Sequence, residues 1–260
     1  MDIQFDIQFE VRDGIAVITL NRPDKKNAML LAMRDRLAEL CEQINDDPQI
    51  RVAVLTGAGR DFCAGADVSE MATGGVQGSL LKARHMNSAI SAVGRLQKPL
   101  IGAVSGVALG MGLSMALACD IVLATDSLRM GAVQRKIGLC PDAGNIWFLC
   151  RYLGVQRAKE LVFSARMLNA KEALEIGLVA RIVAEDALLS EAMTIAQTFV
   201  EAPTLALGVA KRMFSMAPSM GLEEFMELEG SLVPLAAQSQ DFKEGTRAFM
   251  EKRPPKFVGN

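Results

Sequence analysis

The sequence predicts an α/β fold with a helical C-terminal region, and three observations lead to this prediction. A short apolar segment typical of a buried strand is followed by a glycine-rich turn and a helical segment twice in the first half of the chain. From about residue 186 the periodicity is helical throughout. Half of the 260 residues are apolar, so the chain can bury a large core. We expect a core over residues 1–200 and a helical region over residues 201–260.

The chain opens with two predicted strands and a helix. Apolar and polar residues alternate strictly over 2–11, which is typical of a half-exposed strand. Asp13 and Gly14 then form a two-residue hairpin signal, so residues 15–20 are expected to return as a second strand. Apolar residues spaced by three and four over 30–44 predict an amphipathic helix that ends near residues 46–48.

The remaining predicted elements follow from the same periodicities. Strands are expected at 52–55, 100–104 and 121–124, a mostly helical segment at 69–96, a turn at 106–112 and a short helix at 113–119. The C-terminal part is expected to hold helices that include the apolar stripe of 188–199 and the segments 204–216, 222–237 and 240–251.

Composition narrows the classes of function. The formal charge of −2 provides no basic field for nucleic acid or an anionic membrane. Five cysteines without a C-x-x-C pair and a single histidine, His85, predict neither a disulfide framework nor a metal site, and they favour a reducing compartment. The first ten residues lack the pattern of a signal or transit peptide, so a cytoplasmic protein is expected.

Residues 99–119 carry no charge over 21 positions, which is long enough to span a bilayer. The segment is rich in glycine and is the only such run, so a buried strand followed by a buried helix is the preferred interpretation.

Two local motifs imitate other enzyme classes. Residues 112–116 (GLSMA) resemble a nucleophile elbow around Ser114, but the single histidine precedes this serine, which is the wrong order for that hydrolase fold. Gly110 and Gly112 imitate a dinucleotide loop, yet Met115 stands at its third glycine position and the helix is too short. Serine hydrolysis and nicotinamide chemistry are therefore disfavoured.

The two glycine turns indicate a different chemistry. Residues 62–67 (FCAGAD) and 108–112 (ALGMG) both follow buried strands and consist of small residues that let a ligand approach the main chain. If their backbone N–H groups converge, one of them at the start of the helix near Met111, they form an oxyanion hole without any charged side chain. Such a site suits a reaction that passes through an enolate.

Five motifs in order resemble the enoyl-CoA hydratase/isomerase (crotonase) family, and the resemblance covers nearly the whole chain. The family's N-R-P…N-A-L is matched by 21–23 and 27–29, and its A-G-A-D-[IL] loop by 64–68. The remaining motifs, G-x-A-x-G-G-G…C-D, G-L-x-P-x-x-G and A-x-E-A…G-L-V, are matched by 106–120, 138–144 and 170–179. The family usually has glycine where this chain has Met111, but a backbone donor survives that substitution if the side chain points away.

The resemblance implies a crotonase-like spiral of ββα units, a C-terminal helical trimerisation region, and homotrimers that often pair into hexamers. It also implies an acyl-CoA thioester substrate and no cofactor, since coenzyme A is part of the substrate. Carried over by position, the oxyanion donors are the N–H groups of Ala66 and Met111. The residues expected to contact the substrate are Lys26, Ala28, Ala64, Asp67, Val68, Leu109, Ser114, Gln134 and Pro141. Asp67 also suits a helix N-cap.

The phosphates of coenzyme A require cations, and the sequence offers two clusters. One comprises Arg22, Lys25 and Lys26, and the other Lys252, Arg253 and Lys256. Solvated charge runs explain both clusters equally well.

The residues at the positions of the family's catalytic acids decide between reactions. Hydratases of this family use two glutamates, and this chain has Ser114 and Gln134 there, neither of which can act as a carboxylate base. Asp142, after Pro141, stands where the family's single-aspartate isomerases carry their acid. One carboxylate can remove a proton from C2 of a 3-enoyl thioester and return it at C4. Leu139, Ile146, Trp147 and Phe148 are expected to form an apolar pocket around it.

Three hypotheses follow. The first is an acyl-CoA isomerase with Asp142 as the acid/base, and the alternative that Asp142 only caps the next helix stays open. The second is a hydratase, or another enolate-forming member of the family, in which Ser114 and Gln134 hold water. The third is a non-catalytic acyl-CoA-binding subunit.

Overall fold

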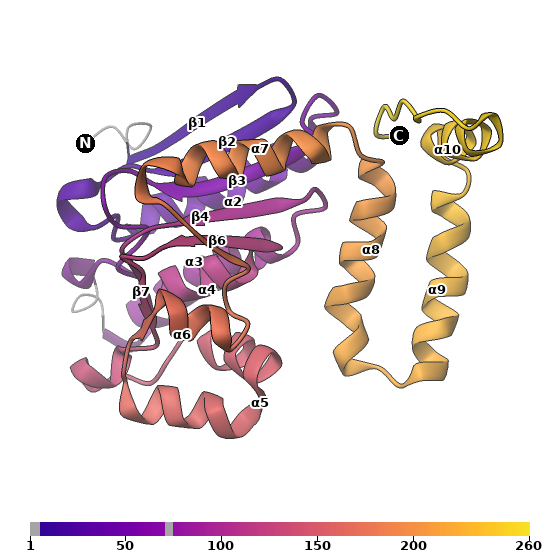
Figure 1. Cartoon of the computed structure of the whole chain (residues 1–260). Helices are drawn as coiled ribbons and strands as arrows, with labels where there is room; N and C mark the ends of the chain where they lie inside the picture. Colours follow the sequence, from indigo (N-terminus) through magenta and orange to yellow (C-terminus); the bar gives the residue numbers. More distant parts are fainter. Residues whose placement is uncertain (1–5, 71–74) are drawn as a thin grey trace.

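A six-stranded sheet lies at the centre of the structure, a computed structural model that describes residues 6–70 and 75–260 (Figure 1). The strand order is β1-β2-β3-β4-β6-β9. Strands β1 and β2 form an antiparallel hairpin around Asp13 and Gly14, and every other neighbouring pair in this sheet is parallel. The strands are β1 (Ile7–Arg12), β2 (Ile15–Leu20), β3 (Val52–Gly57), β4 (Leu100–Val104), β6 (Ile121–Thr125) and β9 (Arg181–Val183).

Both faces of the central sheet are covered, which explains why its inner strands are mostly apolar. In β3, Ala53 and Leu55 face the main core beneath α2 (Leu31–Asp46), α3 (Gly75–Gly94) and α4 (Met111–Ala118). Val52 and Val54 face the other way, against Ala192 and Ala196 of α7 (Leu188–Val200). Side chains of a strand alternate between faces, so a strand buried on both sides carries few polar residues, and the hydroxyl of Thr56 in β3 is hydrogen-bonded to the carbonyl of Ala103.

A second, three-stranded sheet is built from very short strands. Strand β5 (Val107–Leu109) pairs in parallel with β7 (Arg129–Gly131), which pairs antiparallel with β8 (Leu168–Asn169). The prediction of a turn over 106–112 was therefore wrong in part: three of its residues form β5, and Met111 already begins α4. Strand β5 is stabilised by long-range pairing, which local sequence does not reveal.

Three helices at the C-terminal end form an arm, which we define as residues 204–260 (Figure 1). Helices α8 (Thr204–Met216) and α9 (Leu222–Ala236) lie side by side, and α10 (Gln240–Glu251) follows them. Lys211 of α8 contacts the core through an ion pair with Asp120, with 2.7 Å between Nζ and Oδ2. Helix α9 has no buried residue in the described chain. Two further helices of the core are α5 (Asn145–Ser164) and α6 (Ala170–Glu175).

The last residues of the chain return from the arm to the core. The buried carboxylate of Asp241 accepts hydrogen bonds from the N–H groups of Val258 and Gly259, at 2.6 and 2.8 Å. Gly259 lies against the guanidinium of Arg51, which donates to the carbonyl oxygen of Ala202 at 2.6 Å. The arm is thus fixed at the start of α8 and again near residue 259.

Most of the predicted elements are confirmed, including the strands at 15–20 and 100–104 and all the helices from residue 188 onward. The predicted strand at 2–11 starts only at Ile7, and its residues 2–5 lie outside the described part. Residues 71–74 of the predicted helical segment 69–96 also lie outside it. The uncharged run 99–119 forms β4, β5 and α4, and no helix of the described residues meets the length and apolarity that a bilayer crossing requires.

Candidate active site

Three loops that are distant in sequence are joined by main-chain hydrogen bonds. Ala64 N–H donates to the carbonyl of Lys26 at 2.9 Å, and Met29 N–H donates to Gly65 at 2.8 Å. The same 62–67 loop pairs with the β5 segment through Cys63, whose N–H and carbonyl bond Val107 and Leu109 at 2.9 and 3.0 Å. The loops at 26–29, 62–67 and 106–112 therefore form one layer, and the two glycine turns converge as expected.

Glycine is required where these loops touch. A Cβ at Gly112 would lie 2.2 Å from the carbonyl oxygen of Cys63. A Cβ at Gly65, whose φ is +105°, would lie 2.9 Å from the carbonyl oxygen of Leu109. These distances are shorter than van der Waals contact, so the close approach depends on the missing side chains.

The N–H groups of Ala66 and Met111 are available as donors. Within residues 6–70 and 75–260, neither group donates a hydrogen bond. Met111 is the first residue of α4, where a helical N–H has no intrahelical acceptor and the helix dipole is positive. The Met111 side chain is buried in the main core, so it does not block its own N–H from the ligand side. Both donors belong to the joined loops.

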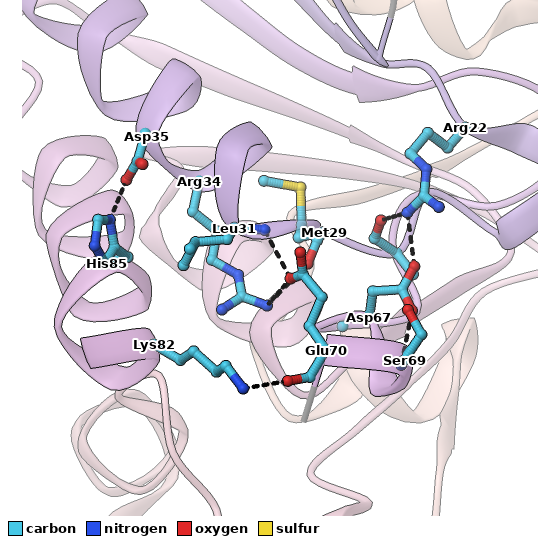
Figure 2. A network of polar contacts seen from close by, with 12 residues as sticks. Arg22, Met29, Leu31, Arg34, Asp35, Asp67, Ser69, Glu70, Lys82 and His85 are labelled. Carbon is cyan, nitrogen blue, oxygen red and sulfur yellow. Dashed lines mark hydrogen bonds and ion pairs between the residues drawn. The ribbon is translucent and has the colours of Figure 1, made fainter. Parts of the chain in front are cut away.

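The segment that follows Ala66 is held by ion pairs (Figure 2). Arg22 Nη1 donates to Asp67 Oδ2 at 2.8 Å, and Ser69 Oγ donates to Asp67 Oδ1 at 2.7 Å. Burial opposes the charged form of Asp67, but the hydrogen bonds from Arg22 and Ser69 outweigh it and lower the pKa of this carboxyl. Arg22 Nη1 also donates to the carbonyl of Ala28 at 2.6 Å, so this nitrogen is used in holding the two loops together.

Arg34 of α2 lies buried beside this segment (Figure 2). Its Nη2 donates to the carbonyl of Met29 at 2.9 Å and lies 3.7 Å from the carboxylate of Glu70. Burial lowers the pKa of Arg34, and the carboxylates of Glu70 and Asp142 oppose that effect. A buried positive charge therefore stands within electrostatic reach of Asp142.

A four-residue polar cluster connects the start of α4 with Asp142. Gln134 Nε2 donates to Asp142 Oδ1 at 3.2 Å and to Asn145 Oδ1 at 2.9 Å. Asn145 Nδ2 donates to the carbonyl of Gly110 at 2.8 Å and to the hydroxyl of Ser114. Ser114 and Asn145 are fully buried, Gln134 is 7% exposed and Asp142 is half-buried. Asp142 is the carboxylate of this cluster.

Asp142 does not cap the helix that follows it. Gly144 is the N-cap of α5, and no side chain accepts a hydrogen bond there. The expected apolar pocket around Asp142 is also only partly present. Phe148 is buried, whereas Leu139, Ile146 and Trp147 are exposed by 41–53%. Ile146 and Trp147 lie on the outer side of the first turn of α5, and Leu139 precedes the helix.

The remaining predicted contacts fall near the joined loops, but not all of them are brought together. Lys26 is exposed and lines a surface cavity of about 720 Å³ with Arg60 and Asp61. Val68 is 65% exposed, and Leu109 and Pro141 are half-buried. Pro141 lies near the polar cluster because it precedes Asp142 in the chain. In the second basic cluster Arg253 is paired with Glu244, at 2.6 Å, so it is not free for a phosphate. No group of three metal-binding side chains occurs within the described residues.

The sequence analysis missed Asn145 and Arg34. Asn145 is the first residue of α5, at a position where polar residues are common, so its type gave no signal. Arg34 stands next to Met33 in the apolar stripe of α2, and a cation beside a buried position could have been noticed.

The chain is similar to known proteins in sequence and in fold. Residues 10–260 match the family model described as enoyl-CoA hydratase/isomerase. The chain is 37% identical over 253 residues to 1,2-epoxyphenylacetyl-CoA isomerase of Escherichia coli, covering 96% of this chain and 97% of the relative. It is 36% identical to 2,3-dehydroadipyl-CoA hydratase of the same organism, covering 94% and 95%.

Solved structures give the same result for the fold. The crystal structure of enoyl-CoA hydratase from Bacillus anthracis superposes with a TM-score of 0.93 at 33% identity, covering 98% of this chain and all of that chain. The resemblance drawn from the five motifs is confirmed, and with it the crotonase fold. The relatives include both hydratases and an isomerase, so they establish the common family and not one reaction. The chain belongs to the enoyl-CoA hydratase/isomerase (crotonase) family.

Proposed function

We propose that the protein is an acyl-CoA isomerase that moves a C=C bond, converting a 3-enoyl-CoA or a related unsaturated acyl-CoA to the 2-enoyl isomer. The observation that carries the proposal is the cluster at the start of α4, in which Asp142 is the carboxylate and Ser114 and Gln134 replace the family's glutamates. Neither a hydroxyl nor an amide exchanges protons with carbon at neutral pH. Asp142 is thus left as the proton carrier.

The proposed mechanism uses one base and two backbone donors. The thioester oxygen accepts hydrogen bonds from the N–H groups of Ala66 and Met111, which stabilise negative charge as it develops on that oxygen. Asp142 removes a proton from C2, and the electron pair delocalises into the thioester and the neighbouring double bond to give a dienolate. The same carboxyl then returns the proton at C4, so the double bond lies between C2 and C3 and no atom is gained or lost.

The arrangement of Ser114 and Gln134 supports isomerisation over hydration. The Ser114 hydroxyl is buried and accepts from Asn145, and both Nε2 hydrogens of Gln134 are donated to Asp142 and Asn145. The Gln134 amide nitrogen and the Ser114 oxygen are thus used within the cluster, and Gln134 Oε1 is buried, so the two side chains are poorly placed to hold and activate a water molecule. Hydration remains the second candidate, because a relative at 36% identity is named as a hydratase. A non-catalytic acyl-CoA-binding subunit is the third.

Purified protein supplied with a trans-3-enoyl-CoA tests the proposal, with absorbance reporting the conjugated product and mass spectrometry reporting any added water. We expect migration without a change of mass. Asp142→Asn keeps the shape of the side chain and should lower kcat by about 10²–10⁴ while acyl-CoA binding, measured by calorimetry, is retained. An undiminished rate would remove Asp142 from the mechanism. Gain of water from a trans-2-enoyl-CoA would favour the hydratase, and binding without turnover would favour the third candidate.

We also propose that residues 201–260 mediate a homotrimer, with pairing into a hexamer as the larger alternative. Large apolar side chains on the arm support this, because Phe214, Phe249 and Met250 are each at least 79% exposed in the single chain. The division at residue 200, the cytoplasmic location and the absence of a cofactor remain predictions from the sequence.

A further inference from the structure

The hydrogen bonds of the polar cluster have a fixed direction. The carbonyl oxygen of Gly110 can only accept, so the Asn145 group that faces it at 2.8 Å must be the amide NH₂. Asn145 Oδ1 is then turned toward Gln134, and an oxygen there requires that Gln134 present its own NH₂, at 2.9 Å. The second hydrogen of that group is donated to Asp142. The Gly110 carbonyl therefore sets the orientation of both amides.

An unpaired atom supports this direction. Gln134 Oε1 is buried and has no hydrogen-bond partner within the described chain. If the amide were turned over, Oε1 would face two acceptors, Asn145 Oδ1 and Asp142 Oδ1, and electrostatic repulsion would result. The orphaned oxygen is the consequence of an orientation that Asn145 enforces.

At its other end, the polar cluster contacts the peptide between Gly110 and Met111, and the N–H of Met111 is one of the two proposed oxyanion donors. The carbonyl of Gly110 and the N–H of Met111 belong to one peptide group, which is planar and rigid. That carbonyl accepts from the N–H of Ser114 at 3.2 Å and, more closely, from Asn145 at 2.8 Å, and together the two bonds fix the plane and thereby the direction of the Met111 N–H. They also polarise the peptide, because hydrogen bonding at the oxygen strengthens donation at the nitrogen.

We propose that Asn145 is a positioning residue that orients two parts of the site at once, the Met111 N–H directly and the Asp142 carboxylate through Gln134. The inference rests on the proposed function, since it assigns Asn145 a task in stabilising an enolate and in holding its base. Gln134 donates to the carboxylate and so fixes the direction in which the proposed base faces. In the proposed mechanism Asn145 acts through these two groups and is assigned no contact with the reacting atoms.

Two variants separate the two tasks. Asn145→Ala removes the side-chain donor to Gly110, leaves the longer bond from the Ser114 N–H, and frees the Gln134 amide to turn. Gln134→Met removes the donor to Asp142 and leaves the bond between Asn145 and Gly110 in place. A matched control is Thr56→Val in β3, which loses one buried hydrogen bond to the carbonyl of Ala103, 3.0 Å long, remote from the cluster.

The first readout is how the effect divides between kcat and KM for isomerisation. Both cluster variants lose the hydrogen bond that orients the Asp142 carboxylate, so kcat should fall by about ten- to a hundred-fold with little change in KM. Thr56→Val should leave both constants unchanged.

The second readout does not require catalysis. Acetoacetyl-CoA forms an enolate whose absorbance rises when an oxyanion hole stabilises it, so the bound spectrum reports the Met111 N–H at equilibrium. Asn145→Ala should lower the enolate fraction at fixed pH, whereas Gln134→Met and Thr56→Val should not. An unchanged enolate fraction in Asn145→Ala would overturn the assignment to Met111, and an unchanged kcat in Gln134→Met would overturn the path to Asp142. If wild-type protein forms the enolate but does not isomerise, the proposed function fails while the enolate readout still decides the role of Asn145.

Discussion

At the scale of single residues, the contacts of Asn27 explain why the motif N-A-M begins with asparagine. Its side chain is fully buried and accepts from the N–H of Arg22 at 2.8 Å while donating to the carbonyls of Ala58 and Asp61. Its φ is +54°, a left-handed conformation that asparagine tolerates better than most residues. Another residue type would lose either the backbone shape or three hydrogen bonds.

Cysteine chemistry gives a prediction at the same scale. Burial raises the pKa of the Cys41 and Cys63 thiols to about 12, and burial also raises the pKa of Cys119. These thiols stay protonated at pH 8, and the thiolate is the reactive form. Iodoacetamide at pH 8 should therefore modify the exposed Cys140 first and the half-buried Cys150 more slowly, as followed by peptide mass spectrometry. Modification of Cys63 in native protein would contradict this, and urea-unfolded protein, labelled at all five, is the control.

At this scale, some residues of the candidate site were predictable from the sequence and others were not. The backbone donors and Asp142 were placed from motifs, because a motif records the local shape of one loop. The hydrogen bonds of Asn145 were not predictable. They join it to Ser114 and Gly110, which precede it by 31 and 35 positions, and they depend on the orientation of two side-chain amides. The exposure of Leu139, Ile146 and Trp147 was missed for a similar reason: sequence proximity to Asp142 does not fix the side of α5 on which a residue lies.

At the scale of elements, length separates what the sequence predicts from what it does not. Helices α2 and α7 to α10 have 12 to 16 residues each, enough for a helical period to be recognised. Strands β5, β7, β8 and β9 have two or three residues each and show no alternation. Such strands are defined by pairing with distant partners, which only the folded chain supplies.

The contact between the two glycine turns gives a prediction about elements. In Gly112→Ala the new Cβ would meet the Cys63 carbonyl, so the turn at 62–67 must move away from α4. We expect a loss of about 2–3 kcal/mol in stability, with the melting temperature lower by roughly 6–10 °C and activity reduced further. Calorimetry and the isomerase assay measure the two effects. Gly94→Ala is the matched control, because beyond its chain neighbours and its own helix backbone no atom of the described residues lies within 4 Å of the new Cβ, and equal behaviour of the two variants would refute the explanation.

At the scale of the whole molecule, the last residues of the chain contact the core again, so the arm is attached to the core at both of its ends. Asp241→Ala leaves two N–H donors unsatisfied, at Val258 and Gly259, and should cost about 2 kcal/mol. The loss should concentrate in the arm, so limited proteolysis should cut within 204–260 before the core unfolds. Glu223→Ala, an exposed change on α9, should alter stability by less than about 0.5 kcal/mol. Cleavage of the core and arm at equal rates would argue against separate anchoring.

The proposed trimer gives a second prediction at this scale. Three copies of 28.0 kDa amount to about 84 kDa, the mass expected from light scattering of wild-type protein, with twice that for a hexamer. Phe249→Glu places a charge where 82% of the residue is exposed in one chain, and it should shift the mass toward that of a single copy. Val11→Glu on the edge strand β1 is the control. A wild-type mass near 28 kDa would refute the assembly.

The main-chain bonds that join the loops at 62–67 and 106–112 have an evolutionary consequence. Under the proposed mechanism, the groups that activate the thioester are peptide N–H groups, and no substitution except proline removes a peptide N–H. Side chains around them can therefore change, glutamates becoming serine and glutamine or the reverse, while thioester activation persists. One scaffold can in this way pass from one reaction to another through intermediates that still activate substrate, which accounts for hydratases and isomerases at nearly equal similarity to this chain.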